Sequence, residues 1–149
     1  NKKFIFFATK KGIVKKVPLE EYDAMKRTGI VSIKLKDGDE LAAVTFINQE
    51  EMILVTKNGM TIRFNTAEMP ISSRTAQGVK GMNISDDDSI IAALPISNNA
   101  DYLAIISEDG LGKKIELKEF INKTAVAKEY HVTKEQLSEQ NWCLMIMIF

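Results

Sequence analysis

An internal repeat limits the possible fold of this chain more than any other feature of its sequence. Residues 6–12 (FFATKKG) match residues 53–59 (ILVTKNG), and both match residues 104–110 (AIISEDG). The spacing between the copies is 47 and then 51 residues. A period of about 40 to 50 residues is typical of propeller-like folds, in which each repeat forms one small antiparallel sheet.

Each copy has the pattern of β-structure. Short runs rich in Ile, Val, Phe and Thr are separated by turn pairs, and glycine in these pairs supplies the positive φ angle that a tight hairpin needs. The turn pairs are Lys11-Gly12, Asp37-Gly38, Asn58-Gly59 and Asp109-Gly110. We predict an all-β fold with repeats at about 3–47, 51–96 and 102–120 of a single partial domain spanning 1–149. Three repeats are fewer than the ~4 to 8 that usually close a propeller, so the chain reads as a piece of one.

Composition excludes a disordered chain and a membrane-spanning helix. The chain has 149 residues, of which 45% are hydrophobic, enough to form a core. Its longest apolar runs, residues 4–8 and 144–149, are far shorter than the ~20 residues of a bilayer-crossing helix. Cys143 is the single cysteine, and no signal peptide precedes the first apolar run, so we expect a cytoplasmic protein.

The formal net charge is zero, but the charge is unevenly distributed. Residues 1–47 contain ten basic and six acidic side chains, residues 48–96 contain four and six, and residues 97–149 contain six and eight. Binding to nucleic acid depends on lysine and arginine, so the total argues against such a partner. The excess of basic side chains in the first repeat nevertheless makes binding to nucleic acid possible at that part of the chain.

No catalytic, metal-binding or cofactor-binding pattern stands out. His131 is the single histidine and reads as a surface side chain, and phosphate-binding and dinucleotide-binding glycine motifs are missing. The acidic run Asp86–Asp88 matches Asp37-Gly38-Asp39 of the first copy, which indicates a solvated turn and not a cation site. Because its carboxylates would repel DNA, we expect this turn to lie away from any path of phosphates.

Several segments resemble one known family. They are residues 8–16 (ATKKGIVKK), 18–22 (PLEEY), 33–41 (IKLKDGDEL), 74–81 (RTAQGVKG) and 110–114 (GLGKK). In this order they closely resemble the repeats of the C-terminal domain of the DNA gyrase A subunit. The resemblance covers about residues 3–120.

The resemblance implies a β-pinwheel, a six-bladed disc whose neighbouring blades exchange strands and whose basic rim bends DNA. It implies a non-catalytic domain of an ATP-dependent type II topoisomerase that binds double-stranded DNA without sequence preference and supports negative supercoiling. The partners would be the gyrase B subunit together with the rest of the gyrase A subunit, in the cytoplasm at the nucleoid. The cleavage tyrosine and the ATP site lie elsewhere in that enzyme, so Tyr22, Tyr102 and Tyr130 are not read as catalytic.

A rim that bends DNA needs basic side chains at repeated positions, so that phosphates are met once per repeat. Backbone contacts of this kind position a duplex without reading its sequence. The candidates occupy equivalent repeat positions or basic loops of the family. They are Lys15, Lys16, Arg27, Arg63, Arg74, Lys80, Lys113 and Lys114.

Two other functions fit the same pattern. The equivalent domain of topoisomerase IV is an incomplete pinwheel that binds DNA but wraps it less. A propeller-like module for protein interactions, with no role in DNA binding, fits the net neutrality. In every case, the open sheet edges of a partial ring favour self-association.

The tail at 121–149 departs from the family. Where a basic, glycine-rich loop is expected after Phe120, the chain continues with residues 121–129 (INKTAVAKE). Reading its codons in a shifted frame permits Gln-Asn-Arg-Gly-Gly-Lys-Gly, which is the family's box pattern, so we hypothesise a frame shift that DNA sequencing would test. As written, residues 133–141 could form a short helix, and residues 144–149 could add as a strand to a sheet edge.

Overall fold

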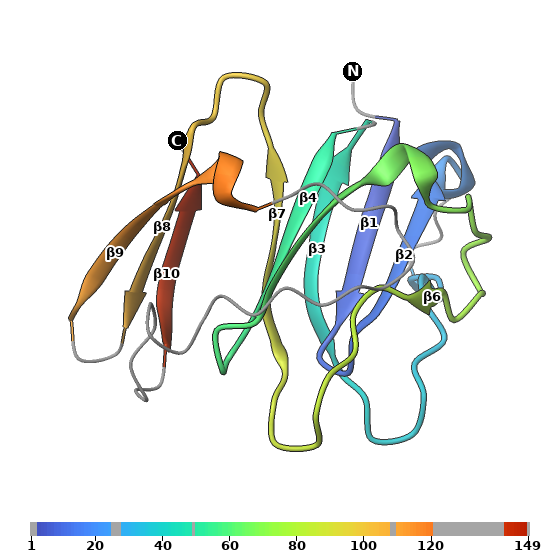
Figure 1. Ribbon diagram of the computed structural model, residues 1–149. Coiled ribbons are helices and arrows are strands. Elements are labelled where there is room, and N and C mark those ends of the chain that lie inside the picture. The colour runs from blue at the N-terminus through green and yellow to red at the C-terminus, as the bar shows by residue number, and fades with distance from the viewer. Residues whose placement is uncertain (1–2, 25–27, 49, 108–109, 121–141, 149) are drawn as a thin grey trace.

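The computed structural model describes residues 3–24, 28–48, 50–107, 110–120 and 142–148. Within these ranges all the strand pairs in the sheets are antiparallel, and the helical segments are three short 3-10 helices (Figure 1). The strands are β1 (Phe4–Thr9), β2 (Ile13–Pro18), β3 (Leu41–Ile47), β4 (Glu51–Thr56), β5 (Thr61–Asn65), β6 (Val79–Lys80), β7 (Ile90–Ile96), β8 (Tyr102–Ser107), β9 (Gly112–Glu116) and β10 (Trp142–Ile148). The helices are η1 (Leu19–Tyr22), η2 (Thr66–Glu68) and η3 (Leu117–Glu119). The predicted all-β class is confirmed.

The same three-stranded unit occurs three times. In each unit a central strand pairs with its hairpin partner on one side and with a third strand on the other. The central strands are β1, β4 and β8, their hairpin partners are β2, β5 and β9, and the third strands are β3, β7 and β10. The first sheet has the order β3-β1-β2-β6, the second β5-β4-β7 and the third β10-β8-β9. The internal repeat of the sequence is thus a repeat of strand pairing.

Local turn chemistry explains why each hairpin forms. Gly12, Gly59 and Gly110 have φ angles of 91°, 84° and 82°, which favour glycine in the turn. In the first two hairpins a threonine hydroxyl at the end of the central strand accepts a hydrogen bond from the backbone across the turn, at 3.1 Å from Ile13 N and 3.0 Å from Met60 N. The predicted turns are confirmed at these glycines.

The acidic turns at Asp39 and Asp88 stabilise the first two hairpins through hydrogen bonds to their backbone. The Asp39 carboxylate accepts hydrogen bonds from the backbone N–H groups of Lys11 and Glu40. The Asp88 carboxylate accepts the equivalent bonds from Asn58 and Ser89. The equivalence of the two acidic segments, expected from the sequence, is therefore a shared structural role.

The three sheets stack face to face, and the core lies between them. Phe6 and Phe64 face each other across the first and second sheets, with ring centroids 6.3 Å apart. A second core forms between the other face of the second sheet and the third sheet, with Ile53, Leu103 and Ile105 fully buried in it. The second sheet therefore packs against a neighbouring described sheet on both faces, and the first and third sheets each do so on one.

The second repeat contributes backbone to the first sheet. Residues 71–82 cross the outer edge of β2, where β6 pairs with Ile13 and Val14. Further along, Ser72 N donates to the Lys16 carbonyl at 2.9 Å and Gly81 N donates to the Gly12 carbonyl at 2.9 Å. This is the exchange of strands between repeats that the resemblance implied.

The tail supplies the last strand of the third sheet. β10 pairs antiparallel with β8, in the place that β3 takes beside β1 and β7 beside β4. The predicted strand at the end of the tail is thus confirmed as far as Ile148. Phe149, the proposed helix at 133–141, His131 and Tyr130 lie outside the described residues. Within the described part, no helix is long and apolar enough to span a bilayer.

Candidate nucleic-acid interface

Lys15 was expected on an exposed rim, but the structure places it in the interior. Its exposed fraction is 1%. Its ammonium group donates hydrogen bonds to three carbonyl oxygens, those of Ser32 at 2.8 Å, Arg74 at 2.5 Å and Ala76 at 2.9 Å. The segments 71–80 and 28–36 lie over this face of β2, and Lys15 ties both of them to the sheet.

Lys16 is also buried, which corrects the expectation of a paired basic contact to DNA. Its exposed fraction is 3%, and its ammonium group donates to the Thr66 carbonyl at 2.7 Å. The same ammonium lies 5.1 Å from the centroid of the Phe4 ring, a distance at which cation–π attraction adds to the hydrogen bond. Lys16 therefore joins the first repeat to the start of η2 in the second.

Burial lowers the pKa of both lysines below the ordinary value of 10.5, because desolvation penalises the charged form. For Lys15 the nearby Glu21 charge opposes this shift, and the Arg74 charge adds to it. The carbonyl oxygens around the ammonium groups compensate part of the desolvation. The structural role of these lysines is to hold neighbouring segments through backbone hydrogen bonds, and their ammonium groups are not exposed on the surface.

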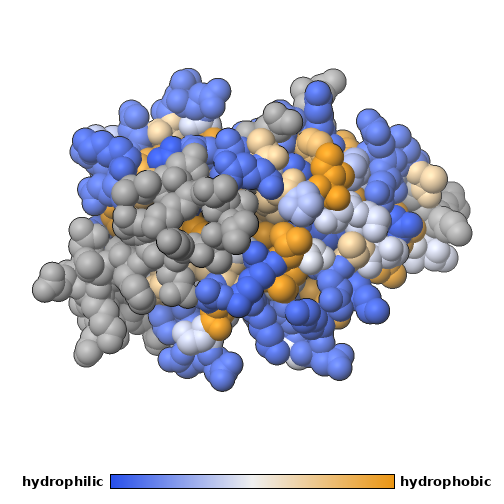
Figure 2. Space-filling model, turned by 45° about the vertical axis from the view of Figure 1, so that its right-hand side comes forward, coloured by the Kyte–Doolittle hydropathy of each residue, from blue (hydrophilic) through white to orange (hydrophobic). Residues whose placement is uncertain are grey.

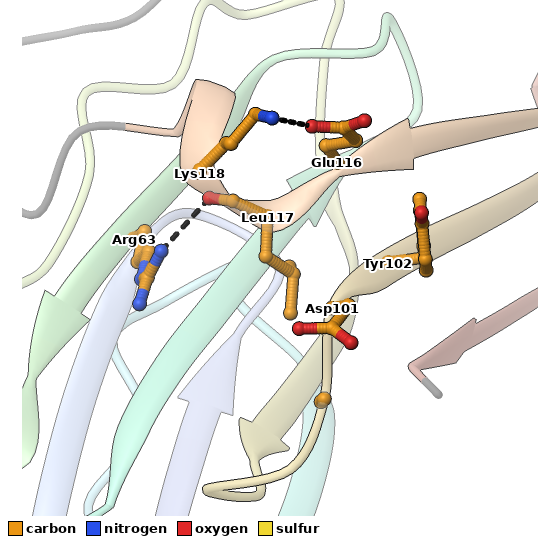
Figure 3. Close-up of a pocket in the computed structure, with 7 residues that line it drawn as sticks. Arg63, Asp101, Tyr102, Glu116, Leu117 and Lys118 are labelled. Carbon is orange, nitrogen blue, oxygen red and sulfur yellow. Dashed lines mark hydrogen bonds and ion pairs between the residues drawn. The ribbon is translucent and has the colours of Figure 1, made fainter.

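Arg63 repeats the arrangement of Lys16 one sheet further on. Its Nη1 donates to the Leu117 carbonyl at 2.8 Å (Figure 3). Its guanidinium also pairs with the Glu51 carboxylate. Leu117 is the first residue of η3, as Thr66 is the first residue of η2. Arg63 is half-buried at the junction of the second and third sheets, so it too joins neighbouring repeats.

The remaining candidates lie nearer the solvent. Arg74 is half-exposed, and its Nη1 donates to the Val31 carbonyl at 2.7 Å. Lys80 is exposed at β6, Lys113 is half-buried and Lys114 is exposed on β9. Arg27 lies outside the described residues.

Two loops bring basic side chains together at the free end of the first sheet. We call residues 28–36 and 71–80 the loop pair, because Lys34 N donates to the Ala76 carbonyl at 3.3 Å and Arg74 reaches across to Val31. Lys34 is exposed on this pair, although the sequence did not select it as a site. The sequence feature that could have identified Lys34 is the basic run at residues 33–36 (IKLK), which lies within one of the segments that resemble the family. The loop pair also exposes Val31, Leu35, Ile71 and Val79. Figure 2 turns this end toward the reader and shows hydrophilic and hydrophobic patches side by side.

The structure places Lys80 in a different setting from the loop pair's other cations. Lys80 borders a surface hollow that is also lined by Lys10, Lys11, Glu40, Asp86 and Asp88. Lys10 pairs there with the Glu40 carboxylate. The acidic turn was expected away from any path of phosphates, but it shares this hollow with the candidate Lys80. The mixed charge makes the hollow a poorer surface for a polyanion than the loop pair.

Comparisons with known proteins agree with this architecture. A family model described as DNA gyrase C-terminal domain, beta-propeller, matches residues 3–48, 50–97 and 101–128. The DNA gyrase A protein of Deinococcus deserti is 38% identical over 113 residues, and that of Ureaplasma parvum is 32% identical over 117. These matches cover 72% and 78% of this chain but 14% of each relative, so the chain spans a small part of their length.

Two solved structures share the fold. The C-terminal domain of a DNA topoisomerase IV gives a TM-score of 0.88 at 27% identity, covering 100% of this chain and 47% of that one. A DNA gyrase A C-terminal domain gives 0.72 at 25% identity, covering 86% and 41%. Because the family model matches all three repeats in order, this chain belongs to the DNA gyrase C-terminal domain family, with its β-pinwheel architecture.

Proposed function

We propose that this chain is a DNA-binding part of a gyrase A protein that holds the phosphate backbone of a duplex and helps to bend it. The observation that supports this most is the loop pair, where Lys34 and Arg74 lie on adjacent segments at one end of a family member. Lysine and arginine on such a surface release counterions from DNA, which favours binding without sequence preference.

Lys15 prepares this surface without contacting DNA. Its three hydrogen bonds fix the backbone at Ser32, Arg74 and Ala76, so the loops are ordered before a duplex arrives. Ordering a flexible loop during binding costs free energy, and a preorganised loop avoids that cost. Lys16 and Arg63 act in the same indirect way, because they fix the stacking of neighbouring repeats.

Arg74 combines positioning with further donor capacity. An arginine side chain carries five N–H donors, and the bond to the Val31 carbonyl occupies one of them. The planar guanidinium can meet phosphate oxygens with the remaining donors. Lys34, Lys80, Lys113 and Lys114 would add single-point contacts along the path of the duplex.

In the intact enzyme, the gyrase B subunit together with the rest of gyrase A would supply strand cleavage and ATP hydrolysis in the cytoplasm at the nucleoid. This chain would contribute curvature of the DNA and no catalytic group. Three repeats offer a short path, so we expect weak binding and a small but handed change in supercoiling from the chain alone.

Fluorescence anisotropy with a labelled duplex of random sequence tests the proposal. We expect binding at low salt that weakens steeply as salt rises, with about 0.9 counterions released per phosphate contact. Arg74→Ala and Lys34→Ala should each weaken binding. Lys118→Ala is the matched control, because Lys118 is exposed on η3 and paired with Glu116. Absence of binding at low salt would refute the proposal and favour a protein-interaction module.

The topoisomerase IV counterpart is a second candidate, because the solved topoisomerase IV domain aligns with the whole chain. A plasmid relaxed in the presence of the chain distinguishes the two. A handed shift of the topoisomer distribution supports the gyrase type, since this requires wrapping. Binding without such a shift supports the topoisomerase IV type.

A further inference from the structure

A glutamate occupies the same position in every repeat. It is the ninth residue after the turn glycine and the third residue of the 3-10 helix η1, η2 or η3. The three residues are Glu21, Glu68 and Glu119. An acidic side chain near a surface that binds DNA repels phosphates, so a carboxylate at Glu21, beside the loop pair, calls for a role other than charge.

The side chain of Glu21 reaches from the first repeat to the basic loop of the second. Its Oε2 accepts a hydrogen bond from the backbone N–H of Arg74 at 2.7 Å, although the two residues are 53 positions apart. The Lys15 ammonium donates to the carbonyl of the same Arg74 at 2.5 Å. Both polar backbone groups of Arg74 are therefore bonded to side chains of opposite charge on the first repeat.

Arg74 lies in a β-turn, which explains why its N–H needs an outside acceptor. Ala76 N donates to the Ser73 carbonyl at 3.2 Å, so Arg74 and Thr75 are the central residues of this turn. The closing bond of a β-turn uses the N–H of its last residue and leaves the first central N–H free for another acceptor. Because Glu21 is that acceptor, the turn is fastened to η1.

We propose that Glu21 is a positioning residue for DNA binding, whose carboxylate fixes the backbone of Arg74 so that the guanidinium meets phosphate oxygens. The inference rests on the proposed function, because it takes the Arg74 side chain as a phosphate contact. A long side chain on a backbone that is already fixed loses less conformational freedom when a partner arrives. Glu21 therefore strengthens binding to a polyanion, although its own charge opposes that binding.

Two substitutions of Glu21 separate the hydrogen bond from the charge. Glu21→Gln and Glu21→Ala both remove the negative charge, but only glutamine keeps a side-chain oxygen that can accept the Arg74 N–H. In fluorescence anisotropy with a labelled duplex, we expect Glu21→Gln to bind at least as tightly as the parent chain. We expect Glu21→Ala to bind about threefold more weakly, because the turn must be ordered during binding. Tighter binding by both variants would show that only the charge matters and would overturn the inference.

The salt dependence of binding identifies Arg74 as the group that Glu21 positions. Loss of one phosphate contact lowers the slope of log K against log salt concentration by about 0.9. We expect this decrease in Glu21→Ala and in Arg74→Ala, and the parent slope in Glu21→Gln. Adding Glu21→Ala to Arg74→Ala should weaken binding no further, since the positioned guanidinium is already absent. Further weakening in the double variant would overturn the assignment.

Glu20→Ala is the matched control. Glu20 is the neighbouring residue of η1 and is exposed, so its substitution removes an equal charge from the same helix. We expect Glu20→Ala to leave the salt slope unchanged and not to weaken binding. If it weakens binding as much as Glu21→Ala does, the effect belongs to the helix and not to the bond with Arg74, and the inference is wrong.

Trypsin digestion followed by mass spectrometry examines the turn in the absence of DNA. Cleavage after Arg74 should be about tenfold faster in Glu21→Ala than in the parent, because loss of a bond to a charged group lets the turn open more often. Equal rates would show that Glu21 does not hold the turn and would overturn the inference. A parent chain that fails to bind DNA refutes the proposed function together with this inference. A parent that binds no more tightly than Glu21→Ala refutes this inference alone.

Discussion

The lysine pair of the first repeat and the lysine pair of the third occupy the same repeat positions in opposite environments. Lys15 and Lys16 are 1% and 3% exposed and are held by backbone carbonyls. Lys113 is half-buried and Lys114 is exposed. The difference comes from residues 71–82 and η2, which the second repeat lays over the first. Coverage by the neighbouring repeat thus determines whether a basic side chain at this repeat position is buried and bonded to backbone carbonyls or exposed on the surface.

The largest effect is expected for Lys15→Ala. Removing the ammonium leaves the carbonyls of Ser32 and Arg74 without this donor in a buried site and leaves Ala76 with the Lys34 N–H alone, which costs about 4 kcal/mol. Lys113→Ala at the equivalent position should cost less than about 1 kcal/mol. Urea unfolding of both variants measures the difference. Equal losses of unfolding free energy in Lys15→Ala and Lys113→Ala would show that the two lysine pairs do not differ in environment as described.

Gly78→Ala and Gly29→Ala form the next test, because the two glycines share a repeat position and a positive φ, of 100° and 80°. A Cβ at Gly78 would lie 2.5 Å from the Val14 carbonyl oxygen, whereas a Cβ at Gly29 would meet no atom of the described residues within 4 Å. We expect losses of about 3 and about 1 kcal/mol, since only the first adds a backbone clash to the φ strain. Thermal melting of the two variants would show this ranking, and the reverse order would argue against exchange at β6.

Arg63→Leu should have a smaller effect. The substitution removes the bonds to Glu51 and to the Leu117 carbonyl at a half-buried junction, which costs about 2 kcal/mol. We expect Lys114→Leu, at the same repeat position, to cost under about 1 kcal/mol, the value of an exposed cation–π contact. Guanidinium unfolding at low protein concentration compares them. An unaffected Arg63→Leu variant would show that the junction does not depend on this cation.

The smallest effect concerns pH. The pKa values of Lys15 and Lys16 are lowered in the folded state, so between those values and 10.5 the unfolded state binds more protons. Stability from these two groups therefore rises with pH in that window and is lost as pH falls through the lowered pKa values. Unfolding free energies of the parent and of Lys16→Met, followed from neutral to alkaline pH, should differ in slope. The same slope in both proteins would exclude this linkage.

The sequence predicted the hairpins because their determinants are local. Turn glycines, alternating apolar residues and the repeat register lie within a few residues of each strand that they specify. For the same reason the tail strand at 144–148 could be expected from its apolar run alone. The frame-shift hypothesis for the tail stays a prediction for DNA sequencing.

The burial of Lys15 and Lys16 could not be read from the sequence. Their acceptors at Ser32, Thr66 and Ala76 are 17, 50 and 61 residues away, and a lysine pair has the same local pattern whether or not a later segment covers it. The repeat alone offered a partial signal, because Ile62 of the second copy occupies the position of Lys15 and is buried. A hydrophobic residue at the equivalent position of another repeat indicates that the side chain at the Lys15 position faces the interior.

The most direct test of the account compares Lys16→Ala with Lys114→Ala, the same substitution at one repeat position in two environments. The free energy of unfolding should fall by about 2 kcal/mol for Lys16→Ala, which loses a charged hydrogen bond and the contact with the Phe4 ring, and by less than about 1 kcal/mol for Lys114→Ala. That result would show that coverage by the next repeat sets the role of the cation. Similar losses in the two variants, or a larger loss for Lys114→Ala, would contradict it.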